Sequence, residues 1–191
     1  MPRDIYQLKI TLKDFRPKIW RRIQVDADTL LSDLHKIIQT SMGWTNSHLH
    51  QFIKNKRLYS LPSEDDESGA IDSQGVKLSA LLKKQKDHMV YEYDFGDGWI
   101  HDITLEEILQ VDPAVKYPIC LEGEMHCPPE DCGGTWGYAD MLKILKDKTH
   151  EEYESYITWL GGSFDPCKFD LKAVNKSLRQ KQYGCIEIMD F

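Results

Sequence analysis

The sequence of 191 residues has no long apolar run, and 29% of its residues are charged. A membrane-spanning helix needs about 18 or more consecutive apolar residues, so we expect no membrane partner. The chain also lacks an apolar leader, and its five cysteines are few and odd in number. Secreted disulfide scaffolds use dense, paired cysteines. We therefore expect a cytoplasmic protein with reduced thiols.

The chain also lacks an excess of positive charge, because its formal net charge is -7. Proteins that coat nucleic acid use a broad cationic face, which this composition does not favour. The charge is uneven: residues 1–60 hold 11 Lys and Arg against 5 acids, and residues 61–191 hold 13 against 26. We expect the two parts to attract each other. The basic part offers nucleic acid one small stripe, formed by Arg16, Lys18, Arg21 and Arg22.

Three common enzyme motifs are absent as well. The sequence has no Gly-rich phosphate loop, no Gly-x-Ser-x-Gly elbow and no His-Glu-x-x-His helix. A cysteine nucleophile stays open, because its histidine partner need not be near in the sequence. We assign no cofactor and no metal ligand from the sequence, and we leave enzymatic activity undecided.

Alternating apolar residues over 5–12 and 18–25 predict an antiparallel hairpin. Apolar residues then recur at three- and four-residue spacing over 30–42, which predicts an amphipathic helix with Asp28 or Thr29 as its N-cap. The hairpin and the helix therefore form the first predicted unit.

The next segments complete the first predicted domain. Gly43 is placed to end the helix, and strands are predicted over 48–54 and 57–60. The order strand, strand, helix, strand, strand predicts an α+β fold with a β-grasp-like mixed sheet and a packed helix. Further predictions are a polar loop over 62–75, a helical turn over 78–82, and strands over 89–93 and 99–105 joined by a turn over 94–98.

The composition changes near residue 112, where Pro- and Gly-rich extended segments begin. We therefore predict an α+β domain over 1–112, and a Pro- and Gly-rich loop with a helical subdomain, packed on that domain, over 113–191. The predicted elements of the second part are helices over 138–146, 151–160 and 170–180 and a last strand over 185–189.

Two strands concentrate histidine, tryptophan and aspartate. His48 and His50 share one face of their predicted strand, so their imidazoles can converge on one ligand. Alternatively, they form hydrogen bonds with neighbouring backbone. The turn over 94–98 carries two carboxylates, and the strand after it places Trp99 and His101 on one face, as in a ligand pocket. The alternative role of Asp94 and Asp97 is to close the turn by accepting backbone N–H bonds.

A third cluster lies between residues 120 and 134. Zinc accepts cysteine and histidine ligands, but the gaps of six and four residues between the cysteines differ from a Cys-x-x-Cys knuckle. Zinc binding by Cys120, Cys127 and Cys132 therefore stays open. This loop also carries two acids, Glu130 and Asp131, for which three roles stay open. They contact a ligand, they cap the following helix, or they pair with the basic first sixty residues.

Nearly the whole chain resembles the plasmid pRiA ORF-three-like family, whose members carry the resolvase label TnpR as passengers of insertion elements. The longest matching motifs are Tyr-Asp-Phe-Gly-Asp-Gly-Trp-Ile-His and Pro-Pro-Glu-Asp-Cys-Gly-Gly-Thr-Trp-Gly-Tyr. The resemblance implies an accessory protein of plasmids or mobile elements and supplies no catalytic residues. A serine resolvase needs a Ser nucleophile in an Arg cluster and a basic helix-turn-helix, so we do not predict recombinase activity. The matching segments are 5–10, 17–22, 34–39, 42–44, 48–52, 93–101 and 128–138.

The leading prediction is a non-enzymatic module that binds a protein or a small molecule. One alternative is a metal-assisted hydrolase, in which His48, His50, Asp97 or His101 hold the ion and Glu130 or Asp131 is the base. The other is a nucleic-acid accessory protein that uses the stripe from Arg16 to Arg22. We expect distant segments to share one hollow lined by Trp44, His48, His50, Asp94, Asp97, Trp99, His101, Glu130 and Asp131.

Overall fold

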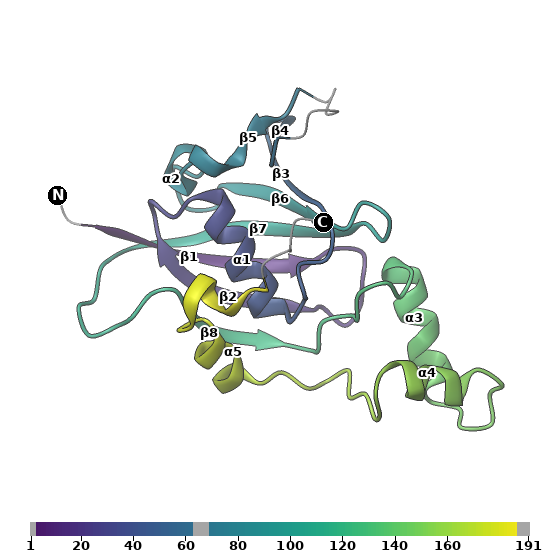
Figure 1. Ribbon diagram of the computed structural model, residues 1–191. Helices are drawn as coiled ribbons and strands as arrows, with labels where there is room; N and C mark the ends of the chain where they lie inside the picture. The colour runs from purple at the N-terminus through teal and green to yellow at the C-terminus, as the bar shows by residue number, and fades with distance from the viewer. Residues whose placement is uncertain (1–2, 63–68, 187–191) are drawn as a thin grey trace.

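The computed structural model describes residues 3–62 and 69–186 (Figure 1). In these ranges eight strands form one sheet, in the order β5-β4-β3-β6-β7-β1-β2-β8. Neighbouring strands are antiparallel except for the parallel pair β4 and β5. The strands are β1 (Asp4–Leu12), β2 (Trp20–Asp26), β3 (His50–Lys54), β4 (Arg57–Ser60), β5 (Ile71–Asp72), β6 (His88–Tyr93), β7 (Trp99–Gln110) and β8 (Ile119–Glu124).

Helix α1 lies across one face of the sheet, with α5 and η2 beside it (Figure 1). Helices α3 and α4 lie beyond the ends of the strands. The mixed sheet, the packed helix and the C-terminal helices confirm the predicted α+β class. The helices are α1 (Leu31–Met42), η1 (Ser73–Gly75), α2 (Leu78–Leu81), α3 (Gly134–Ile144), α4 (Tyr153–Trp159), α5 (Leu171–Ser177) and η2 (Lys181–Gly184).

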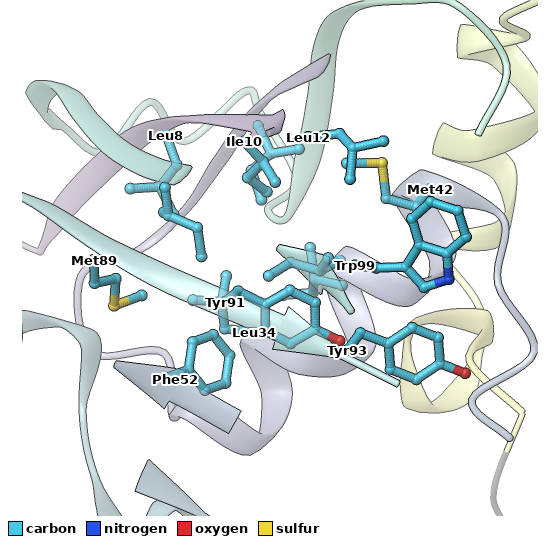
Figure 2. Close-up of a cluster of buried hydrophobic side chains, with 14 of the residues drawn as sticks. Leu8, Ile10, Leu12, Leu34, Met42, Phe52, Met89, Tyr91, Tyr93 and Trp99 are labelled. Carbon is cyan, nitrogen blue, oxygen red and sulfur yellow. The ribbon is translucent and has the colours of Figure 1, made fainter. Parts of the chain in front are cut away.

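The core fills the space between the sheet and α1. Figure 2 shows Leu8 of β1, Tyr91 of β6 and Phe52 of β3 directed into this space with Leu34 of α1. These side chains are buried, and burying each of them contributes on the order of 1.5–3 kcal/mol. The covered face of the sheet is therefore the apolar face that period-two alternation produces.

The start of α1 differs from the prediction, whereas its end confirms it. Gly43 ends the helix in a left-handed conformation with φ of 102°. The N-cap is Leu30, which forms no side-chain capping bond, so neither Asp28 nor Thr29 caps the helix. The Asp28 carboxylate is occupied elsewhere, because it accepts a hydrogen bond from Lys77 at 2.8 Å.

Other boundaries also moved. Residues 71–75 of the predicted polar loop form β5 and η1, and residues 63–68 lie outside the described ranges. Most of the predicted strand over 185–189 lies outside them too. The three predicted C-terminal helices are present, each shorter than predicted or shifted along the chain.

The division near residue 112 stays a prediction. Strand β8, which follows this point, pairs with β2 and so belongs to the same sheet as the first part. Within the described ranges, every helix is too short or too polar to cross a membrane.

Candidate functional site

Three segments far apart in the sequence meet beyond the ends of β6 and β7. They are the segment 44–49 after α1, the turn 94–98 and the segment 130–136 at the start of α3. The backbone N–H of Asp94 donates to Leu49 O at 2.9 Å, and Gly133 N donates to Asp97 Oδ2 at 3.2 Å. We call these three segments together the three-loop surface.

Glu130 anchors the third segment to the first. Its carboxylate accepts hydrogen bonds from Thr45 N at 3.0 Å, from the Thr45 hydroxyl and from the Tyr93 hydroxyl. Burial and the neighbouring Glu130 carboxylate raise the pKa of Tyr93. The Trp44 indole adds a bond to Pro128 O at 3.0 Å. Glu130 and Trp44 therefore hold the loop in place.

Glycine allows the third segment to approach the turn closely. Gly134 has a φ of +66°, and a Cβ there would lie 2.4 Å from Asp97 O. Such a contact is too short for any side chain, so a larger residue would push the loop away from the turn. The Gly133-Gly134 pair thus fixes where Asp131 lies relative to the turn.

The polar centre of the three-loop surface is formed by His48, Asp94 and Asp131. His48 Nε2 lies 3.2 Å from Asp131 Oδ1 and 3.7 Å from Asp94 Oδ2. This nitrogen is buried and forms no hydrogen bond, although both carboxylates are near. In the described ranges, these residues are the one group of three that places its potential metal-ligand atoms within 4.8 Å of one another.

Asp94 closes the turn, which is one of the two roles that the sequence left open. Its Oδ1 closes the turn by accepting from Gly96 N at 3.0 Å and from Asp97 N at 3.3 Å. The other oxygen, Oδ2, faces His48. The turn bonds therefore hold the Asp94 carboxylate in one orientation toward the centre.

Exposed apolar side chains accompany this centre. Leu49 is 66% exposed, Phe95 is 50% exposed and Trp136 is 89% exposed. Leu49 and Phe95 directly follow His48 and Asp94 in the chain, and Trp136 lies in the first turn of α3. We did not predict these three as site residues, because exposure is a tertiary property.

The chain is similar to known proteins of one family. The profile described as "Plasmid pRiA4b ORF-3-like protein" matches residues 4–173. The chain belongs to this family. It is 39% identical over 182 residues to the uncharacterized protein y4hQ of Sinorhizobium fredii (strain NBRC 101917 / NGR234), over 93% of this chain and 92% of that protein. A crystal structure of MM3350, a protein of unknown function from Methanosarcina mazei Go1, is 40% identical with a TM-score of 0.81, over 90% of this chain and 98% of that one.

In this pRiA4b ORF-3-like protein, two of the predicted histidines are buried in the core beneath the three-loop surface. His50 is buried and stacks on His35 with 3.5 Å between ring centroids. His101 is fully buried, and its Nδ1 lies 3.0 Å from Trp99 O. Trp99 is fully buried as well. In place of one shared hollow, these three residues lie in the core, because their faces of β3 and β7 are covered.

Burial also fixes the protonation of the core histidines. It lowers the pKa of His50 to about 2 and that of His101 to about 4. Their neutral rings therefore belong to the packing of the core.

A polar network around His35 of α1 was not predicted from the sequence. His35 Nδ1 lies 2.8 Å from the Tyr91 hydroxyl, and Nε2 lies 2.7 Å from Asn46 Oδ1. Gln39 donates to the same hydroxyl at 3.0 Å. Burial lowers the pKa of His35 to about 4. The position of His35 on the apolar face of its helix, next to Leu34, was the signal in the sequence.

The predicted basic stripe does not form, because Arg21 is buried. Its guanidinium donates to Ser41 O at 2.8 Å and to Glu124 O at 2.9 Å. It also lies 4.1 Å from the centre of the Phe169 ring. Burial lowers the pKa of Arg21. This side chain joins α1, β8 and the segment before α5.

The remaining basic residues form only half of a stripe. Arg22 donates to Glu106 at 2.6 Å and to Glu122, so its charge is balanced within the sheet. Arg16 and Lys18 are exposed. Two exposed cations are too few for the broad face that phosphate binding requires.

The zinc site that the sequence left open is not formed in the described ranges, because Cys120, Cys127 and Cys132 do not bring their sulfur atoms within 4.8 Å of one another. Burial raises the pKa of Cys120 to about 11 and that of Cys132 to about 12, and it raises that of Cys127 still further. The thiolate is the reactive form, so these cysteines are poor nucleophiles.

Proposed function

We propose that this pRiA4b ORF-3-like protein is a ligand-binding module and that the three-loop surface is its binding site. The observation that carries the proposal is the juxtaposition of a polar centre with exposed apolar side chains on loops held by hydrogen bonds. Binding sites commonly combine a few oriented polar groups with apolar and aromatic walls. Trp136, which is 89% exposed, supplies such a wall.

The same contacts weigh against the two alternatives. The hydrolase loses two of its predicted metal ligands, because His50 and His101 are buried in the core. It also loses Glu130 as a free base, because this carboxylate accepts hydrogen bonds from Thr45 and Tyr93, which leaves only Asp131 for that role. The nucleic-acid function needs a cationic face, but Arg21 is buried and Arg22 is paired with acids. Association with a plasmid or mobile element stays a prediction of the family resemblance.

Fragment mapping by NMR tests the proposal without a known ligand. A library of small carboxylates, phosphates and aromatic compounds is titrated into ¹⁵N-labelled protein. Because binding sites attract many unrelated fragments, we expect the shifted resonances to cluster at the Trp136 indole and at the amides of 94–98 and 131–136.

Trp136→Ala should reduce these shifts at least fivefold. An aromatic side chain at the centre of a binding site contributes roughly 1 kcal/mol or more to the binding free energy, which corresponds to about this factor. The matched control is Trp159→Ala, because Trp159 is also exposed and lies in α4, outside the three-loop surface. Fragments that cluster instead in the hollow of about 420 Å³ lined by Lys13, Arg16 and Asp102 would contradict the proposal. Equal losses in the two variants would contradict it as well.

A further inference from the structure

We infer that the three-loop surface binds one divalent transition-metal ion between His48 Nε2, Asp94 Oδ2 and Asp131 Oδ1. The inference rests on the proposed binding function and names the chemistry of its polar centre. One imidazole nitrogen and two carboxylate oxygens suit a transition-metal ion such as Zn²⁺, which accepts both donor types, or Mn²⁺, which favours the carboxylates. Mg²⁺ and Ca²⁺ prefer ligand sets made of oxygen alone.

Two of the three separations are close to those around a common ion. Ligands about 2.0–2.2 Å from one ion lie about 2.8–3.6 Å from each other in octahedral or tetrahedral geometry. His48 Nε2 is 3.2 Å from Asp131 Oδ1 and 3.7 Å from Asp94 Oδ2, and the two carboxylate oxygens lie within 4.8 Å of each other. Rotation of the exposed Asp131 side chain can therefore bring the three atoms to ligand distance.

The hydrogen bonding of His48 is a second observation. Its Nε2 is shielded from solvent and has no hydrogen-bond partner. A buried ring nitrogen normally forms a hydrogen bond, and an N–H group aimed at Asp131 would form one at 3.2 Å. The ring therefore does not direct Nε2 straight at Asp131 Oδ1, and a lone pair on this nitrogen is left for an ion that the two carboxylates share.

The surroundings orient the ligands and keep the site accessible. The Asp94 side chain is only 10% exposed, and two backbone N–H groups occupy its Oδ1, which leaves Oδ2 for the ion. Asp131 is 71% exposed, so solvent reaches the centre from its side. Three protein ligands leave coordination positions for water or for an anionic group of the bound ligand, next to the exposed aromatic side chains.

The test measures binding of ZnCl₂, MnCl₂ and MgCl₂ by calorimetry, with protein purified without an affinity tag. We expect one Zn²⁺ or Mn²⁺ per chain and binding of Mg²⁺ that is at least tenfold weaker. Asp131→Asn keeps the size of an exposed side chain and should weaken Zn²⁺ and Mn²⁺ binding at least tenfold. The matched control is Asp140→Asn, because Asp140 is also exposed and lies in α3.

NMR of the histidine rings adds a readout that locates the ion. Zn²⁺ should shift the ring resonances of His48 and leave those of the buried His50 and His101 in place. The inference would be overturned if neither Zn²⁺ nor Mn²⁺ bound, or if Asp131→Asn left their binding unchanged. His48 would then form an ion pair with its two acids. Fragments that still cluster at Trp136 would then support the binding module without a metal, so the two failures are distinguishable.

Discussion

Neutral imidazoles inside the core make this protein sensitive to acid at the scale of single residues. Burial lowers the pKa of His35 and His101 from 6.5 to about 4, and that of His50 to about 2. As the pH falls below about 6.5, the unfolded chain takes up protons that the folded chain does not. The free energy of unfolding should therefore decrease between pH 6.5 and 4, by up to about 1.4 kcal/mol per pH unit for each histidine.

Urea unfolding at pH 7, 6 and 5 measures this dependence. His101→Leu removes one of the three groups and should reduce the slope by about a third, whatever its effect on stability at pH 7. The control is Ile103→Val, which changes the same buried face of β7 without removing a titratable group and should leave the slope unchanged. A slope that His101→Leu does not alter would show that this imidazole takes up its proton at the same pH in the folded and the unfolded chain.

At this scale the sequence predicted the turn residues better than the strand histidines. Asp94 closes a turn through bonds to residues two and three positions ahead, a local pattern that sequence reveals. For His101, alternation correctly predicted a face shared with Trp99, whereas His48 lies before β3 and shares no strand face with His50. Alternation could not tell that the face of His101 is covered, because α1 and its neighbours come from other parts of the chain.

At the scale of elements, the start of α3 depends on a glycine. Gly134→Ala would place a Cβ 2.4 Å from Asp97 O, at a φ of +66°. We expect it to lower the free energy of unfolding by roughly 2–4 kcal/mol, because it adds a clash with backbone to the conformational strain. It should also weaken fragment binding, because the segment that carries Asp131 moves away from the turn.

Gly161→Ala is the matched control. Gly161 has a similar φ of +71°, but a Cβ there would have no atom within 4 Å. Its cost should be limited to strain, about 1–2 kcal/mol. Urea unfolding of both variants measures the difference, and equal losses would show that the loop does not press against the turn.

The elements themselves could be predicted where their pattern is local. The hairpin of β1 and β2 and the length of α1 follow from periods of two and 3.6 residues. Strand β8 was missed because it is a short strand within a Pro-rich segment and is defined by its pairing with β2, about 100 residues earlier. The N-cap was missed because the Asp28 carboxylate is bound by Lys77, a long-range contact.

At the scale of the whole molecule, the uneven charge agrees with the contacts. Arg22, in the basic first part, pairs with Glu106 and Glu122 from the acidic part, and Lys13 of the first part lies 3.9 Å from Asp102. These pairs are on or near the surface, so each contributes about 1 kcal/mol or less. Because Arg22 is paired with acids, fewer free cations remain in the predicted stripe, which favours ligand binding over nucleic-acid binding.

The meeting of the three loops is likewise a property of the whole chain. The segments 44–49, 94–98 and 130–136 are separated by more than thirty residues each, and their spacing in the sequence carries no signal of contact. The residue types predicted a cluster of nine residues, and the fold brings the side chains of His48, Asp94 and Asp131 together.

Anomalous diffraction from crystals grown with Mn²⁺ locates the ion directly and needs no variant. We expect one strong anomalous peak at about 2.0–2.3 Å from His48 Nε2, Asp94 Oδ2 and Asp131 Oδ1. Crystals in which these three side chains contact only one another, with no peak between them, would contradict this expectation.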